Sequence, residues 1–290
     1  MSVKLQTIDD QRDPTFNQLL GINNQGEISG YFGSGADPLH PNKGYTITPP
    51  YGQANFHNEN FPGSAQTQVT GLNNADHADR TVGFYVDGFG NNIGFVEHDG
   101  QFKSVFDPAG SPLATQANQK PATQQLLGVN GYDVAVGFYT DANGVNHGFT
   151  YDVGQGSFKE VNVAGFTNVT AAAINNSGDI AGFGTFDGKT EGFVEDTKGH
   201  VTPLVGPSGA TAVNALGLNS GGDVVGSWTD AQSNTHGFLF NPKSGAYATI
   251  DAGAKTETVI NGLNDKGELV GFYMDAAKNT HGLLVHVSGS

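Results

Sequence analysis

The chain contains no cysteine and carries few positive charges. Its 290 residues include 13 lysines and arginines against 28 aspartates and glutamates, which gives a formal net charge of −15. The absence of cysteine excludes disulfide bonds, thiol catalysis and cysteine-ligated metal sites. The acidic balance disfavours nucleic acid and anionic membranes as partners, because both present negative charge.

Long apolar runs and long amphipathic helical patterns are also missing. No segment approaches the roughly 20 apolar residues that span a membrane, and Met1–Asp10 lacks the apolar stretch of a secretory signal. We therefore expect a soluble protein. A cytoplasmic location is favoured, and an extracellular location is the alternative if the chain is a mature form. Apolar residues occur in short runs such as Asp179–Phe186. These runs are flanked by Gly, Asn and Asp, a pattern typical of β-strands.

One phrase occurs six times along the chain. It reads glycine (alanine in the fourth copy), an aliphatic residue and asparagine, followed by a turn and an apolar run. The anchor asparagines are spaced 50, 57, 45, 44 and 45 residues apart, a period typical of propeller blades. The sequence therefore predicts a single all-β domain over residues 1–290, a six-bladed β-propeller of four-stranded blades. The anchors are Asn23, Asn73, Asn130, Asn175, Asn219 and Asn264.

The two ends of the chain predict how the ring closes. The last copy reaches its third strand at Leu283–Val287 and then stops. The N-terminal segment Val3–Ile8 resembles Tyr247–Asp251, the fourth strand of the preceding copy. We expect the N-terminal strand to complete the last blade, so that only short, protected sheet edges remain. In the fourth copy the expected strands are Thr170–Asn175, Asp179–Phe186, Glu191–Glu195 and Val201–Val205, with Pro203 restricting the last to an outer edge.

The repeat units carry a family resemblance. GINNQGEISGYF, AINNSGDIAGFG and GLNDKGELVGFYMD, with NVNHGF, SNTHGF and KNTHGL after some of them, resemble the HAF-type "extracellular repeat" units of many bacterial proteins. The resemblance covers nearly the whole chain and implies a propeller more than an activity. A similar propeller body is used by fungal cofactor-free hetero-Diels–Alderases. No catalytic motif of those enzymes matches here, so that similarity is one of fold alone.

Insertions interrupt the repeat at three places. Gly33–Asn42 lies between the second and third strands of the first copy, and Asp107–Thr123 follows the fourth strand of the second copy. In a propeller these two loop types share one face, whereas Ala75–Arg80 joins the first two strands of its copy and belongs to the opposite face. Function on repeat scaffolds concentrates in such loops. We expect a ligand site on the face of the first two insertions, flanked by blades one to three, with tolerated surface insertions as the alternative.

Polar residues recur five positions before the anchor asparagine. Amides and hydroxyls at the innermost strands could orient a neutral, oxygenated ligand without supplying a base. A water-filled axis is the alternative interpretation. The six residues at this position are Gln18, Gln68, Gln125, Thr170, Asn214 and Val259.

Aromatic residues recur at the end of the second strand. The equivalent residues are Phe32, Tyr85, Tyr139, Gly184, Trp228 and Tyr273. We expect the rings to pack between blades, near the face of the two insertions. A Tyr or Trp there could also stack on a sugar or an aromatic ligand. Gly184 leaves a gap that predicts either a pocket or a thinner blade.

Aspartates and histidines repeat without forming a metal pattern. The segment Asp141–Gly148 is similar to a calcium loop but lacks the closing acidic ligand, so we expect ordinary turn aspartates. A three-histidine metal site is disfavoured because the histidines belong to copies that are not all adjacent. We expect repeat-specific packing or turn hydrogen bonds for them, and no metal or other cofactor. The residues are Asp87, Asp141, Asp187, Asp230 and Asp275, and His147, His236 and His281.

The usual catalytic motifs are absent from the sequence. There is no G-x-S-x-G, P-loop or H-E-x-x-H, so no catalytic residue is assigned. His57 and Glu59, close in the first copy, are a weak candidate for a general acid–base pair.

We predict binding of a small neutral, partly aromatic ligand. An enzyme of this kind would be a cofactor-independent cyclase of the hetero-Diels–Alder type, in which orienting the reactants contributes up to roughly 7–11 kcal/mol. The alternatives are a non-catalytic glycan- or surface-binding module and a protein-interaction scaffold. The expected ligand contacts are His40, Gln18, Gln68, Gln125, Tyr139 and Trp228.

Overall fold

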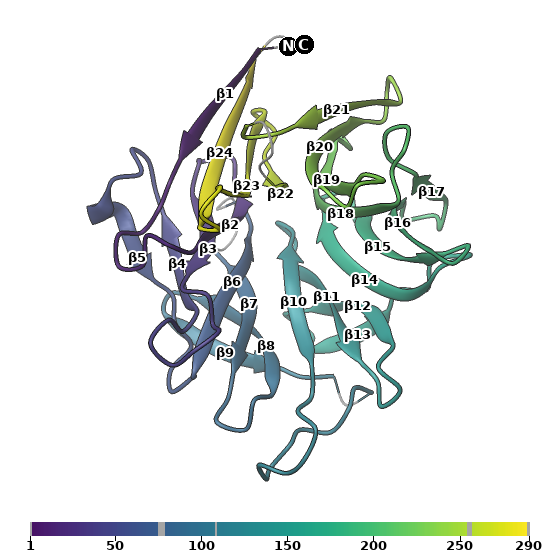
Figure 1. Cartoon of the computed structure of the whole chain (residues 1–290). Coiled ribbons are helices and arrows are strands. Elements are labelled where there is room, and N and C mark those ends of the chain that lie inside the picture. The colour runs from purple at the N-terminus through teal and green to yellow at the C-terminus, as the bar shows by residue number, and fades with distance from the viewer. Residues whose placement is uncertain (1, 75–78, 108, 254–256, 289–290) are drawn as a thin grey trace.

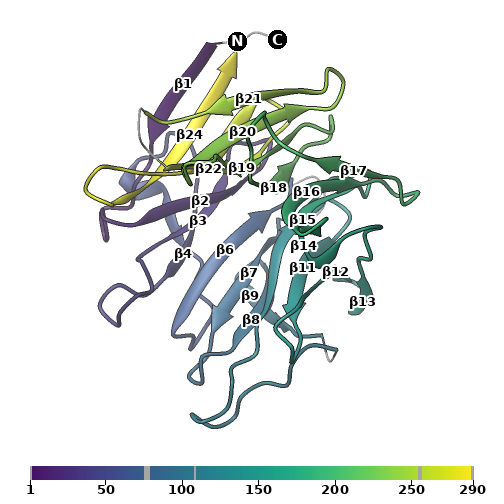
Figure 2. The same ribbon diagram turned by 45° about the vertical axis from the view of Figure 1, so that its right-hand side comes forward.

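The structure, a computed structural model, describes residues 2–74, 79–107, 109–253 and 257–288, and its regular secondary structure is almost entirely β-strand (Figure 1). The strands form six antiparallel sheets of four strands each. The innermost strands converge on a central axis, and the sheets radiate from it (Figures 1 and 2). This arrangement confirms the predicted six-bladed β-propeller.

Each blade is a meander whose strands run in chain order from the axis outward, except that β1 completes blade 6. Blade 1 contains β2 (Asn17–Ile22), β3 (Ile28–Phe32), β4 (Lys43–Ile47) and β5 (Phe56–Asn58), with the short 3₁₀ helix η1 (Gln53–Asn55) before β5. Blade 2 contains β6 (Gln66–Leu72), β7 (Thr81–Val86), β8 (Asn92–His98) and β9 (Gln101–Val105). Blade 3 contains β10 (Gln124–Val129), β11 (Val134–Thr140), β12 (Asn146–Asp152) and β13 (Ser157–Glu160).

The remaining blades repeat this plan. Blade 4 contains β14 (Thr167–Ile174), β15 (Ile180–Phe186), β16 (Lys189–Glu195) and β17 (Val201–Leu204). Blade 5 contains β18 (Ala212–Leu218), β19 (Val224–Thr229), β20 (Thr235–Asn241) and β21 (Ala246–Ile250). Blade 6 contains β22 (Glu257–Leu263), β23 (Glu268–Met274), β24 (Thr280–Ser288) and β1 (Ser2–Thr7). The strand ranges predicted for the fourth copy hold to within a few residues, and Pro203 lies on the outermost strand, as expected.

The ring closes through the N-terminal strand, as predicted. β1 pairs antiparallel with β24 from Val3 opposite Val287 to Thr7 opposite Leu283. Beyond the strand, Gly282 N donates to Asp9 Oδ1 over 2.9 Å. The first and last strands of the chain, β1 and β24, consequently lie side by side (Figure 1).

The hydrophobic core is divided among the interfaces between neighbouring blades. In one cluster Phe149 and Tyr139 of blade 3 pack against Val82 and Val96 of blade 2, and each of these side chains is almost completely buried. Burying one large apolar side chain contributes roughly 1.5–3 kcal/mol, so the stability of the ring depends on every interface between blades being closed.

Glycines let the innermost strands approach one another. Each of these strands has a bulge just before the anchor phrase, as in β6, where the register shifts between Val69 and Gly71. A Cβ atom on Gly71 would lie only 3.1 Å from the Cα of Gly128 in the next blade. The glycine found in five copies of the phrase therefore allows close backbone contact around the axis, and the fourth copy accommodates Ala173 at this position.

Candidate functional site

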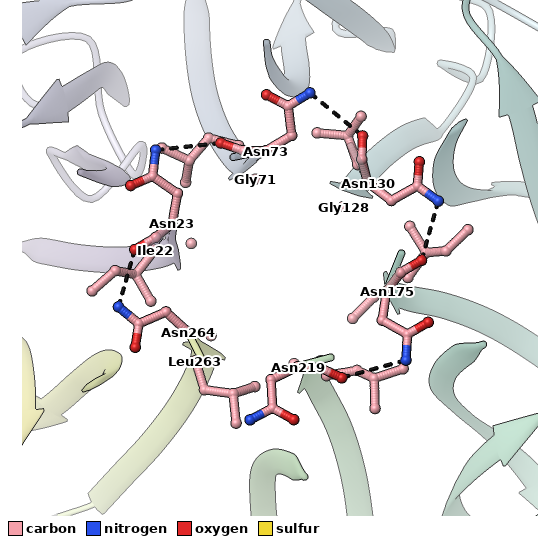
Figure 3. Close-up of a pocket in the computed structure, with 18 of the residues that line it drawn as sticks. Ile22, Asn23, Gly71, Asn73, Gly128, Asn130, Asn175, Asn219, Leu263 and Asn264 are labelled. Atoms are coloured by element: carbon pink, nitrogen blue, oxygen red, sulfur yellow. Dashed lines mark hydrogen bonds between the residues drawn. The ribbon is translucent and has the colours of Figure 1, made fainter. Parts of the chain in front are cut away.

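A cavity of about 210 Å³ lies on the axis, at the ends of the innermost strands where they enter their first turns. Equivalent residues of all six blades line it (Figure 3). The bulged residues of the innermost strands form the lining farthest from the turns, and most of them are apolar. They are Leu20, Thr70, Leu127, Ala172, Leu216 and Asn261.

The six anchor asparagines form a ring around this cavity, which we call the collar (Asn23, Asn73, Asn130, Asn175, Asn219 and Asn264). In five cases the Nδ2 atom donates to the backbone carbonyl of the next anchor, as from Asn130 to Asn175 over 3.1 Å (Figure 3). The Oδ1 atom of Asn130 also accepts from the backbone N–H groups of Tyr132 and Val134. Only an amide side chain donates and accepts in this way at once, which explains the asparagine in every copy.

A second ring, the rim, surrounds the mouth of the cavity. It consists of the residues that follow the anchors: Asn24, Asn74, Gly131, Asn176, Ser220 and Asp265. Asp265 accepts hydrogen bonds from Ser220 N over 2.9 Å, from Ser220 Oγ over 3.1 Å and from Asn24 Nδ2 over 2.9 Å. Partial burial acts in the opposite direction, but these hydrogen bonds lower the pKa of the Asp265 carboxyl. Asp265 is the one ionisable residue among the described residues that line the cavity.

Further carboxylates lie just outside the collar. Four anchors donate to an acidic side chain four residues later in the chain, with Asn264 Nδ2 to Glu268 Oε2 the shortest at 2.7 Å. Burial, and next the charge of Asp79, raise the pKa of Glu27. Several carboxylates therefore surround this end of the axis, where Arg80 is paired with Asp133. The four acidic residues are Glu27, Asp179, Asp223 and Glu268.

The predicted glutamine contacts lie toward the other end of the axis. Gln68 Nε2 donates to Asn42 Oδ1 over 2.8 Å, and Gln125 Nε2 donates to Asn92 Oδ1 over 3.3 Å. Each bond reaches the preceding blade, so these amides link blades. Gln18 pairs with Tyr31 of β3 in the strand register. None of the three glutamines lines the cavity.

The repeated aromatic residues pack between blades, as expected: Tyr139 shares a buried cluster with Val82 of blade 2, and Trp228 packs against a cluster that contains Leu204 of blade 4. Tyr139 is buried and stacks on His147 with ring centroids 5.0 Å apart, and Trp228 stacks on His236 at 4.5 Å. At Gly184 the backbone carbonyl of Thr167 and the ring of Phe166 lie 2.8 and 3.4 Å from the position that a Cβ atom would take, so neighbouring atoms occupy the space of the missing side chain. Neither Tyr139 nor Trp228 lines the axial cavity.

Each repeated histidine binds two carboxylates of its own blade. His281 Nδ1 lies 2.7 Å from Asp9 Oδ2, and its Nε2 lies 3.2 Å from Asp275 Oδ2. The equivalent bonds join His147 to Glu160 and Asp141. The aspartates also accept turn N–H groups, as Asp141 Oδ1 does from Asn143 and Val145. The structural role expected for these residues is confirmed, and no cluster able to hold a metal occurs in the described part of the chain.

His40 has a partner that the sequence did not indicate. Its Nδ1 lies 2.7 Å from Asp13 Oδ2, and this hydrogen bond raises the pKa of the half-exposed imidazole. Asp13 is 27 residues away in the chain and belongs to the connection between β1 and β2, so no local pattern could reveal it. Residues 2–74 contain no hydrogen bond or ion pair between His57 and Glu59, so the acid–base pair is not formed.

The two large insertions are ordered by specific hydrogen bonds. Asn91, which is fully buried, accepts from the N–H groups of Ala114 and Ala122 and donates to the Ala114 carbonyl. Gln66 Oε1 accepts from Asn42 N at the end of the first insertion. We call the face that carries these loops the insertion face. The cavity opens at the opposite face, where the third insertion begins; of Ala75–Arg80, residues 75–78 lie outside the described part.

Comparisons with known proteins support the fold and assign no activity to this chain. No family model matches the chain, and no curated protein matches it. A TolB-like protein from Agrobacterium tumefaciens has a TM-score of 0.60 at 12% identity, covering 86% of this chain and 87% of that one. An Aleuria aurantia lectin has a TM-score of 0.57 at 11% sequence identity, covering 95% of this chain and 93% of the lectin. A virginiamycin B lyase from Staphylococcus aureus reaches 0.51 at 10%, covering 99% and 100%.

These similarities show the propeller fold alone. They confirm neither the resemblance to HAF-type repeats nor that to hetero-Diels–Alderases, which both stay predictions. In the described ranges no helix is long and apolar enough to cross a bilayer.

Proposed function

We propose that the protein is a binding module whose axial cavity takes one small, ring-bearing organic molecule, apolar end first. The observation that carries this proposal is the cavity itself. Leu20, Leu127 and Leu216 supply apolar walls, whereas amide and hydroxyl groups surround its mouth. Apolar lining with a few placed polar groups is the usual composition of a ligand site. The buried part of the ligand is uncharged, since no ionisable side chain reaches the inner lining of the cavity.

The size of the cavity restricts the ligand. Sites for drug-sized molecules enclose roughly 300–1,000 Å³, whereas this cavity encloses about 210 Å³. A single ring fits such a space, and two reactants held side by side exceed it. Binding is therefore favoured over the predicted cyclisation, which requires both reacting parts in one site.

A terminal sugar residue is the alternative occupant. The glycan-binding interpretation of the sequence agrees with the lectin fold among similar structures, but sugar sites commonly present an aromatic face. The described lining of this cavity contains no aromatic side chain. We therefore favour a ligand with an apolar ring over a sugar.

Ligand-observed NMR with benzyl alcohol and methyl glucoside tests the proposal. Ala172 lies at the inner lining, so Ala172→Phe fills the cavity, whereas Ala231→Phe adds the same side chain to an exposed loop of the insertion face. Benzyl alcohol should bind the wild type and Ala231→Phe but not Ala172→Phe. Binding of the glucoside alone favours the glycan module. Binding of neither probe, or binding that Ala172→Phe leaves intact, overturns the proposal.

The insertion face is a second candidate site, for a surface or a protein partner. Eight large apolar residues are exposed in the described ranges, and five of them lie in the loops of this face: Leu39, Phe89, Leu113, Val145 and Val205. The predicted contacts His40, Gln18, Gln68, Gln125, Tyr139 and Trp228 belong toward this end and remain a proposal. Trp228 is the single tryptophan of the chain. Its fluorescence should change when a ligand binds at this face and stay constant when one fills the axial cavity.

A further inference from the structure

The rim of the cavity is chemically uneven. Ser220, Asp265 and Asn24 come from three successive blades and are joined by hydrogen bonds, including one from Asp265 N to Asn24 Oδ1 of 2.9 Å. On the other side of the mouth, Gly131 contributes no side chain. One edge of the mouth therefore presents a fixed carboxylate, whereas the opposite edge presents Gly131 between the neutral amides of Asn74 and Asn176.

Asp265 retains capacity for a ligand. A carboxylate offers about four lone-pair sites, and three hydrogen bonds from Ser220 and Asn24 occupy part of them. Lys266, the next residue in the chain, forms no ion pair with Asp265 within residues 257–288. The carboxylate is thus positioned by its neighbours without being neutralised by a cation.

The charge surrounding the mouth selects among ligands. Glu27, Asp179, Asp223 and Glu268 lie just outside the collar, and the whole chain carries a net charge of −15. A cleft lined by one sign of charge concentrates ligands of the opposite sign. Carboxylate and phosphate ligands are repelled at this mouth, and cationic ones are attracted.

We infer that the ligand carries a primary ammonium group on its apolar ring and that Asp265 binds this group at the rim. The inference rests on the proposed function, because it requires the apolar part to occupy the cavity. The ring lies against the leucine walls, and the ammonium donates to the Asp265 carboxylate. A charge-assisted hydrogen bond of this kind is stronger than a neutral one. The ligand class is therefore a small aryl- or cycloalkyl-methylamine.

The test compares three probes of one shape by isothermal titration: benzylamine, benzyl alcohol and benzoate. Benzylamine should bind the wild type about tenfold or more tightly than benzyl alcohol, and benzoate should not bind. Asp265→Asn should abolish the preference for benzylamine and retain benzyl alcohol. Ala172→Phe should abolish both, and Ala231→Phe should change neither. Raising the salt concentration should reduce the preference for benzylamine in the wild type, a readout that does not depend on the folding of any variant.

Equal binding of benzylamine and benzyl alcohol by the wild type overturns this inference and leaves the proposed function standing. A preference for benzylamine that survives Asp265→Asn with a native circular dichroism spectrum also overturns it. Failure of every probe to bind defeats the proposed function itself, so the two failures are distinguishable.

Discussion

The two ends of the propeller axis are built from one repeat and differ in how regular they are. At the collar, five of six neighbouring anchors are joined by the same side-chain-to-backbone hydrogen bond. At the insertion face, the equivalent loops differ in length and are held by bonds that are not repeated among the described residues of the other blades, such as those of Asn91. The cavity nevertheless lies at the regular end.

The comparison shows that a symmetric end can contain the better-formed cavity. Six equivalent strands converge on the axis, and five of the six anchor amides hold the next anchor, so the walls are fixed before any ligand arrives. Chemical asymmetry is then introduced by single residues of the rim, chiefly Asp265 and Gly131. At the irregular end, long loops instead present exposed apolar side chains over a wider surface.

Removing residues 1–9 should have the largest effect, because both ends depend on a closed ring. The deletion takes β1 from blade 6 and removes the Asp9 contacts with His281 and Gly282. We expect the free energy of unfolding to fall by several kcal/mol, since a whole edge strand and the buried Ile8 are lost. Thermal unfolding followed by circular dichroism measures this, with Lys4→Ala as the control that keeps the strand. An unchanged midpoint would contradict closure by β1.

Asn130→Ala should break the collar end with the next largest effect. The change removes a donor to Asn175 and an acceptor for the N–H groups of Tyr132 and Val134. Because buried polar groups are left without hydrogen-bond partners, the free energy of unfolding should fall by about 2–4 kcal/mol. The matched change at the other end is Asn91→Ala. There the long loop can turn its freed N–H groups toward water, so we expect the free energy of unfolding to fall by only about 1 kcal/mol. Urea unfolding compares them; equal losses would show that the two ends are equally rigid.

Most of the fold could be predicted from the sequence, because the anchor phrase marks the same strand end in every blade. The location of the cavity could not, since it depends on how closely the bulged residues approach across the axis. The glycines that govern this approach, such as Gly71 and Gly128, are part of the phrase, but their contacts are between blades. The collar did leave a signal, namely an asparagine retained in all six copies beside varied neighbours. The Asp13–His40 pair left none.

Glu59→Leu should sharpen the comparison by removing a partly buried charge that lies near blade 2. The N–H of Glu59 donates to the carbonyl of Gly44 on the third strand of blade 1. In other blades the residue opposite the equivalent glycine is apolar, namely Ile8, Val105 or Ile250. Burial first, and then the charges of Glu97 and Glu27, raise the pKa of Glu59 to about 7.

Because the folded-state pKa of Glu59 lies above the unfolded value of 4.5, the folded state holds its proton more tightly, and stability is lost as pH rises from about 4.5 to 7. The loss is at most about 3 kcal/mol and smaller where solvent reaches the side chain. Glu59→Leu should be more stable at pH 7 and show a flatter profile of unfolding free energy against pH. Glu257→Leu, at an exposed position, is the control. A wild-type unfolding free energy that does not fall over this pH window would contradict a raised pKa of Glu59.

His40→Ala should have the smallest effect and tests how much the first insertion contributes to the fold. His40 is half exposed, and its pKa is raised through the hydrogen bond to Asp13. The stabilisation it provides is full below its unfolded pKa of 6.5 and is lost as pH rises through the folded value. Since exposed ion pairs contribute little, the unfolding midpoint should not move measurably at any pH. NMR titration of the imidazole should nonetheless give a pKa above 6.5 that Asp13→Asn returns toward the ordinary value. A large loss of stability in His40→Ala would instead make the insertion face as dependent on its polar contacts as the collar is.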